Sequence, residues 1–503
     1  MSITTTVGAS LRQKIGRGFT RINADQEKEK GGARALLSSL LIFSELRFIR
    51  VHLRPTSLPL YVALCALALG ALPFAPAASA QDTVTPDAQL EAADTYVIRN
   101  ARVVTVSGPD IENGTVVVSG GRIAAVGASV NVPAGAREID ARGLTVYPGM
   151  IDAGTSMGLV EINSGAPGTV DTNELGDMNP NAAAMWGVNP HSAHIDVTRV
   201  AGVTSAVALP GGGTISGQAA LLNLAGTTQR ELALVPAAAL VIDFPRLGGG
   251  GGFGGFQPAP AITPDAVTAR DRRVEEIRRL LREAEAYGRA QDAYRQDPKG
   301  VPRPDTDLRL AALVPYVRGE RPVILRADRE RDIRGAVLFA QEMKLRPVIL
   351  GGSDAWKAAQ FLKERNVPVI LDGILNLPLR EDDPYDTLYE NASKLHAAGV
   401  QFAISTGDSG AHVRDLPFHA GMAAAFGLPR LEALKAVTLY PAQIMGVADR
   451  LGSVEAGKIA NLVVTDGDLL EARTNVRHLF INGRPVPLVS RHTVLYDQFK
   501  DRK

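Results

Sequence analysis

Five polar side chains near apolar segments are the first candidates for chemistry in this sequence. Asp408 follows a predicted strand, with His412 and His419 soon after it, and His191 and His194 lie at the predicted start of a helix. A carboxylate and several imidazoles could together bind a divalent metal such as Zn²⁺ or Mn²⁺. The histidines lack ligand spacing, however, so ordinary surface or core histidines are the alternative interpretation.

Two serine segments resemble nucleophile motifs. Residues 154–158 fit Gly-x-Ser-x-Gly around Ser156, but an irregular loop is predicted where a nucleophile elbow needs a helix. Residues 407–410 read Gly-Asp-Ser-Gly around Ser409, as in all-β proteases, whereas this region is α/β. We therefore favour neither serine. The glycine-rich segment 210–217 could cradle an anion, but it lacks the lysine of a P-loop, which favours a tight turn.

The elements that must position these residues alternate between strand and helix over residues 148–447. Such alternation predicts parallel strands. Eight units close a (β/α)8 TIM-type barrel in about 250 residues or more, and an open doubly wound sheet is the alternative. In a barrel the loops after the strands share one face, so the histidines could approach Asp408. Strands are predicted at 204–209, 234–242, 322–325, 347–350, 368–371 and 401–405.

Short alternating strands flank this α/β region at residues 94–147 and 448–492. Neither stretch has enough strands for a stable pair of sheets, so we predict one small composite β-sandwich built from both chain ends. The predicted architecture is an interrupted barrel with this sandwich beside it. A length of 503 residues accommodates both.

Three segments interrupt or cover the predicted barrel. Residues 153–190 are rich in Gly, Asn and Pro without periodicity, and loops this long are usually functional or disordered. Residues 248–260 are of low complexity. Residues 264–293 form a charged helix with i,i+4 opposite-charge pairs, typical of an outer helix or lid.

The N-terminal residues 1–80 are predicted to be an extension ending in a signal peptide. They hold ten Lys/Arg and four Asp/Glu, and an apolar run ends before Ala78 and Ala80, which suit signal peptidase. The run is too short for a comfortable membrane span of about 20 residues. We therefore expect export to the periplasm or beyond. The only cysteine, Cys65, lies in this run, so no disulfide is expected in the mature chain.

Several segments together resemble the amidohydrolase superfamily, most closely its imidazolonepropionase-like members. Residues 148–152 match the Pro-Gly-x-Ile-Asp of that family's first barrel strand, and 201–204 its second-strand entry. Residues 405–409 resemble its eighth-strand motif and 431–442 the helix after the barrel. Residues 451–464 closely resemble its return to the β-sandwich. The resemblance extends over most of the chain after the N-terminal extension.

The resemblance implies hydrolysis of C–N bonds with one or two divalent metals, but it also shows which ligands are replaced. The family's first-strand histidines correspond to Gly154 and Ser156, and its fifth-strand histidine to Arg326. The sixth-strand histidine falls at Gly351 or the next residue, and only Asp408 survives. Arg326 would repel a metal ion and could instead bind a carboxylate or phosphate.

The resemblance therefore predicts a hydrolase of non-peptide C–N bonds, such as those of a cyclic amide, with a degenerate metal site. The alternative is a catalytically inactive binding protein of the same fold in the periplasm. A small molecule is the expected ligand. A net charge of +1 gives no reason to expect nucleic acid, and a homo-oligomer is left open. The candidate site residues are Asp408 for catalysis or metal binding, and Arg326, His191, His194 and His412 for substrate binding.

Overall fold

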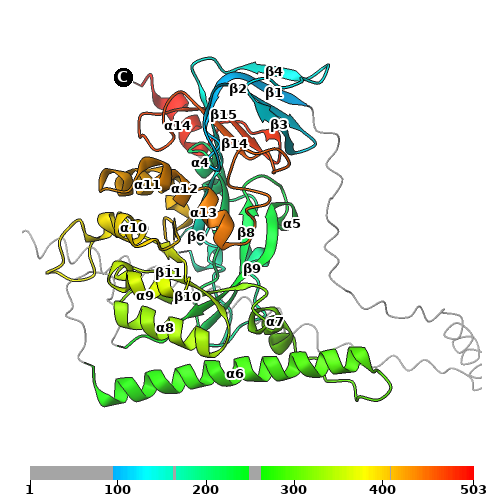
Figure 1. Ribbon diagram of the computed structural model, residues 1–503, viewed down its shortest axis with the longest axis vertical. Helices are drawn as coiled ribbons and strands as arrows, with labels where there is room; N and C mark the ends of the chain where they lie inside the picture. The colour runs from blue at the N-terminus through cyan, green and yellow to red at the C-terminus, as the bar shows by residue number, and fades with distance from the viewer. Residues whose placement is uncertain (1–94, 163–165, 248–261, 408, 503) are drawn as a thin grey trace, which may run out of the picture. The chain divides into compact units, whose positions relative to one another are not determined.

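The computed structural model describes residues 95–162, 166–247, 262–407 and 409–502 (Figure 1). The predicted signal peptide, the low-complexity segment 248–260 and Asp408 lie outside the described residues. Among the helices that are described, none is long and apolar enough to cross a membrane.

Eight strands form one nearly closed sheet in chain order, which confirms the predicted TIM-type α/β barrel. A hydrogen bond from Ser405 Oγ to the carbonyl oxygen of Gly154, 2.9 Å long, links the last strand region to the first. The strands are β6 (Met150–Thr155), β7 (Val203–Ala208), β8 (Ile215–Asn223), β9 (Ala233–Asp243), β10 (Pro322–Ala327), β11 (Arg346–Gly351), β12 (Val369–Leu371) and β13 (Phe402–Ile404).

The expectation of parallel strands throughout is wrong for β8, which pairs antiparallel with both β7 and β9. A tight turn replaces the helix that would otherwise connect β7 to a parallel neighbour. Gly212 and Gly213 have positive φ in this turn. A Cβ on Gly213 would lie 2.8 Å from the carbonyl oxygen of Asp177. The glycines of segment 210–217 therefore allow the preceding loop to pack against the turn.

Helices cover the outside of the barrel (Figure 1). In α8 (Glu330–Glu342), for example, buried apolar residues such as Ile333, Val337 and Ala340 recur at helical spacing and form one face that packs on the sheet. Those after β7 are α5 (Gln229–Leu232), α6 (Pro264–Gln296), α7 (Leu308–Val317), α8 (Glu330–Glu342), α9 (Ala359–Glu364), α10 (Thr387–Ala398), α11 (Leu416–Ala425), α12 (Arg430–Ala436) and α13 (Leu439–Ile444). Earlier in the chain lie α3 (Ala184–Gly187) and α4 (Ala193–Arg199), and α14 (Arg491–Phe499) lies near the C-terminus.

The predicted charged helix is α6, which begins after the N-cap Thr263 and extends three residues beyond the predicted end. Its buried side chains, which include Ile277 and Leu281, recur at helical spacing. Arg278 Nε lies 2.8 Å from Glu342 Oε1, which joins α6 to the end of α8. This long helix is therefore an outer element that is fixed to the barrel wall.

Both ends of the chain contribute to a second eight-stranded sheet. The junction is the antiparallel pairing of β5 with β14, which brings Val146 opposite Val464. The Asn461 amide reaches the barrel, because its Nδ2 lies 2.9 Å from Asn223 Oδ1 in β8. The strands are β1 (Tyr96–Val103), β2 (Ile111–Ser119), β3 (Arg122–Gly127), β4 (Arg137–Asp140), β5 (Thr145–Pro148), β14 (Leu462–Thr465), β15 (Val476–Ile481) and β16 (Arg484–Pro485).

Candidate active site

The end of β6 shows why the predicted first-strand ligands are absent. A Cβ on Gly154 would lie 3.0 Å from Leu209 Cδ1 and 3.3 Å from Leu350 Cδ1. Both leucines are buried in the apolar cluster inside the barrel. An imidazole at position 154 would therefore have to displace leucine side chains. The space beside Gly154 is apolar, and position 154 itself supplies no ligand side chain.

Ser156 follows β6 in a turn, and no helix comes directly after it. Its hydroxyl oxygen accepts a hydrogen bond from the backbone N–H of Gly410 at 3.2 Å. This bond ties the β6 turn to the short 3-10 helix η3 (Gly410–Asp415). The local geometry is not that of a nucleophile elbow.

A carboxylate occupies the predicted sixth-strand ligand position. A Cβ on Gly351 would lie 2.6 Å from Asp328 Oδ1, and Gly351 has a φ of 103°. Most side chains are strained in this left-handed region, so the position favours glycine for two independent reasons. The Asp328 side chain, which comes from the end of β10, fills the space that a histidine at 351 would need.

These residues do not fit the divalent metal of the family. Among the residues that the structure describes, no three His, Cys, Asp or Glu side chains are grouped so that they could bind a metal ion. Two ligand positions are filled by leucine side chains and by Asp328, and Arg326 adds positive charge. We therefore derive no chemical step through a metal.

Asp328 is the carboxyl group best suited to proton transfer at this end of the barrel. Burial raises its pKa, while a hydrogen bond from Ser353 Oγ, 3.0 Å long, opposes that rise. The charge of Arg246 also lowers the pKa, and Asp243 at the end of β9 raises it. A carboxyl with a raised pKa beside an arginine is a candidate general base.

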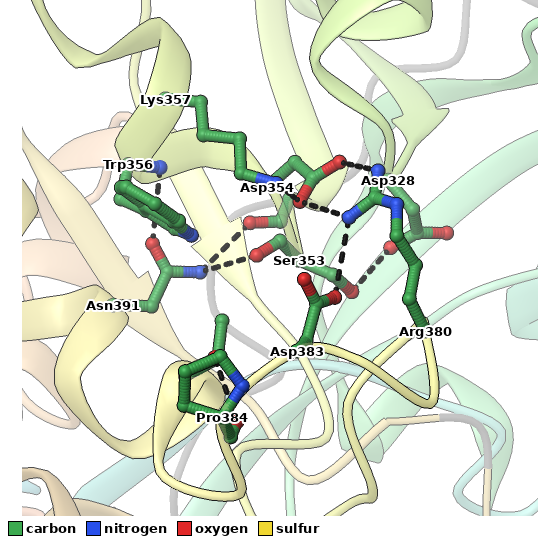
Figure 2. Close-up of polar contacts among 11 residues, drawn as sticks. Asp328, Ser353, Asp354, Trp356, Lys357, Arg380, Asp383, Pro384 and Asn391 are labelled. Atoms are coloured by element: carbon green, nitrogen blue, oxygen red, sulfur yellow. Dashed lines mark hydrogen bonds and ion pairs between the residues drawn. The ribbon is translucent and has the colours of Figure 1, made fainter.

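A network of ion pairs fixes the loop after β11, as Figure 2 shows. Arg380 binds Asp354 through its two terminal guanidinium nitrogens, at 3.1 and 2.7 Å, and Lys357 Nζ lies 2.9 Å from Asp354 Oδ1. Burial alone would raise the pKa of Asp354, but the hydrogen bonds from Arg380 and Lys357 outweigh it, so the pKa is lowered. Arg380 also contacts Asp383 at 3.2 Å.

Asn391 of α10 holds the same loop from the other side (Figure 2). Its Nδ2 donates to the carbonyl oxygens of Gly352 and Ser353, at 2.9 and 3.2 Å, and its Oδ1 accepts from the Trp356 backbone N–H. Ser353 is thereby held where its hydroxyl reaches Asp328. The loop that carries Ser353 is thus positioned by α10 and by the segment that contains Arg380.

Asp152 is a second unusual carboxyl group, fully buried within β6. Burial raises its pKa to about 6, although hydrogen bonds from Thr406 and the Gly154 backbone N–H oppose the rise. Thr406 donates to Asp152 Oδ2 from both its hydroxyl and its backbone N–H. These bonds join the first strand of the barrel to the segment after the last strand. We therefore assign Asp152 a structural role.

The fold has a clear counterpart among solved structures. A solved amidohydrolase from Thermotoga maritima MSB8 is 25% identical, with a TM-score of 0.67, and the match covers 78% of this chain and 99% of that one. The chain belongs to the amidohydrolase superfamily. The Amidohydrolase family model matches residues 359–486.

Curated relatives of this chain have a similar degree of identity. Imidazolonepropionase from Bradyrhizobium diazoefficiens is 25% identical over 405 residues, which cover 73% of this chain and 92% of that protein. Amidohydrolase tasK from Hapsidospora irregularis is 27% identical over 378 residues, which cover 70% of this chain but only 37% of tasK. The predicted imidazolonepropionase-like membership is confirmed.

The histidines predicted for the amidohydrolase site lie in different environments. His191 and His412 are exposed, whereas His194 is half-buried in α4. His419 is buried in α11, and burial together with the charge of His412 lowers its pKa to about 4. Their binding roles, like that of Asp408, stay predictions.

The sequence interpretation missed Asp328, Asp243 and the Asp354–Arg380 pair. One signal was present, because Asp328 comes shortly after the predicted strand 322–325. In a barrel, polar residues at the C-terminal ends of strands are the first candidates for chemistry. The partner Ser353 lies 25 residues further along the chain, and sequence spacing does not reveal that contact.

Restoring one family ligand should fail to restore metal binding. We expect Gly154→His to lower the free energy of unfolding by about 2 kcal/mol, because the side chain overpacks against Leu209 and Leu350. Thermal melting and zinc content after dialysis would measure both effects. Adding Leu209→Ala should recover part of the stability. If Gly154→His bound one equivalent of zinc and kept the stability of the wild-type protein, the conclusion that leucine side chains fill this space would be wrong.

Proposed function

We propose that this protein hydrolyses a carbon–nitrogen bond other than a peptide bond in a small molecule such as a cyclic amide. Its membership of the amidohydrolase superfamily supports this reaction class, and relatives over most of the chain are named imidazolonepropionase. The single observation that carries the proposal is Asp328. This carboxyl has a raised pKa, an ordered hydrogen-bond partner and a nearby arginine at the C-terminal ends of the strands.

The proposed reaction uses side chains of the chain itself. The Asp328 carboxylate accepts a proton from water as the water oxygen bonds to the substrate's carbonyl carbon. The carbonyl oxygen becomes negative, and the guanidinium of Arg246 stabilises that charge. When the C–N bond breaks, Asp328 returns the proton to the leaving nitrogen. The products are a carboxylic acid and an amine, so atoms and charges balance.

Asp328→Asn tests this mechanism. We expect hydrolysis of responsive cyclic amides to fall about a hundredfold, because an amide side chain cannot accept the proton. Turnover would be followed by mass spectrometry on metal-free protein across a set of cyclic amides. The matched control is Asp305→Asn, an exposed carboxyl between α6 and α7.

Two further results decide the assignment. Ser353→Ala keeps the carboxylate but removes a hydrogen bond that lowers its pKa, so the acidic limb of the pH–rate profile should move to higher pH. Equal turnover by Asp328→Asn and the wild-type protein would show that Asp328 is not the base. Activity that appears only with added zinc would show that the metal-free mechanism is wrong.

A second candidate function is ligand binding without turnover. The leucines beside Gly154 favour it, because they fill the space of the family's first-strand ligand with apolar atoms. In this case the proposed ligand contacts include Arg326, His191, His194 and His412. A cyclic amide that raises the melting temperature yet is recovered unchanged after long incubation would favour this candidate over hydrolysis.

A further inference from the structure

A cavity of about 300 Å³ lies where α8 begins. Its charged lining comes from the segment after β10, the loop after β11 and the loop that contains Arg380. Four of these side chains are basic and two are acidic, namely Arg329, Arg331, Lys357 and Arg380 together with Glu330 and Asp354. The lining therefore carries an excess of positive charge.

The two acids do not neutralise all four basic groups. Asp354 is engaged by both Arg380 and Lys357, as Figure 2 shows. Glu330 pairs at 2.9 Å with Arg334, which does not line the cavity. Neither acid is thus paired with Arg329 or Arg331.

The two remaining arginines have few acidic contacts of their own. Arg331 donates to the carbonyl oxygen of Leu247 at 2.8 Å, and its nearest acidic contact, Asp332, is 3.8 Å away. Arg329 makes no ion pair with any residue that the structure describes. Two guanidinium groups on one small cavity match the oxygens of a carboxylate or phosphate.

The backbone at the N-terminus of α8 adds to the preference of this cavity for an anion. Arg329 is the N-cap residue of α8, a helix of 13 residues, and its side chain makes no capping hydrogen bond. The partial positive charge of a helix N-terminus favours an anion. This term reinforces the arginines and would be weak without them.

We propose that this cavity binds a small oxyanion, either the carboxylate of an organic acid or a phosphate group, chiefly through Arg329 and Arg331. The site goes beyond the proposed hydrolysis and stands whether or not Asp328 is a base. The volume suits an anion of a few heavy atoms or one charged end of a longer molecule.

Isothermal titration with inorganic phosphate and with succinate, at constant ionic strength, tests the site on the whole protein. We expect at least one of them to bind, and Arg329→Gln and Arg331→Gln each to weaken its affinity about tenfold. The control Arg272→Gln removes an exposed α6 arginine whose ion pair with Glu276 is long, at 3.9 Å. Its affinity should equal that of the wild-type protein.

Each outcome decides the proposal. Binding of phosphate alone supports it and assigns a phosphate group, whereas binding of succinate alone supports it and assigns a carboxylate. Absence of binding by either anion overturns it, as does a loss of affinity in Arg272→Gln equal to that in the cavity variants. Because the readout is binding, a failure here leaves the hydrolysis test unaffected.

Discussion

Gly149→Ala is expected to lower the free energy of unfolding by about 4 kcal/mol, a large effect for one methyl group. Gly149 joins β5 to β6, and a Cβ there would lie 2.2 Å from Thr204 Oγ1 and 2.3 Å from Thr204 Cγ2. Thr204 is fully buried in β7, where close packing opposes a shift of its side chain. Urea unfolding followed by circular dichroism would measure the loss.

A glycine without such a neighbour provides the control. A Cβ on Gly168 would meet nothing within 4 Å, so Gly168→Ala should change stability by less than about 1 kcal/mol. Combining Gly149→Ala with Thr204→Gly removes the clashing atoms and should recover part of the loss. Equal stability of the two single variants would show that β6 and β7 adjust to the methyl group.

The barrel could be predicted from the sequence because its determinants are local. Apolar runs alternate with amphipathic helices, and residues 148–152 and 451–464 match superfamily motifs. The strand β8 was missed because residues 210–217, which lead into it, are rich in Gly, and Gly locally favours a turn. Its pairing on both sides outweighs this preference, and no local pattern records that pairing.

The candidate site was less predictable, because its key contacts join distant segments. The superfamily resemblance predicts that Gly154 and either Gly351 or Gly352 stand at ligand positions, but it does not predict what fills the space beside them. That answer depends on Leu209 and Leu350 for the first position and on Asp328 for the second. Each of these side chains comes from a different strand than the glycine beside it. Only the folded barrel therefore shows that apolar side chains and one carboxyl group lie together at this end of the strands.

The pH dependence of stability should differ between the wild-type protein and Asp152→Asn by about 2 kcal/mol between pH 4 and pH 7. Burial raises the pKa of Asp152 to about 6, against about 4 in an unfolded chain. The folded state therefore binds the proton more tightly, and protonation stabilises it. This stabilisation is complete below pH 4 and is lost as the pH rises through 6.

Asparagine cannot titrate, so urea unfolding of both proteins at half-unit steps of pH isolates the Asp152 contribution. The stability of the variant relative to the wild type should rise with pH through this window. Thr406→Val removes a hydroxyl that donates to the carboxylate and lowers its pKa, so it should move the transition to higher pH. Parallel stability curves for wild type and Asp152→Asn would mean that the Thr406 and Gly154 hydrogen bonds fully offset burial, and that barrel closure is independent of pH in this range.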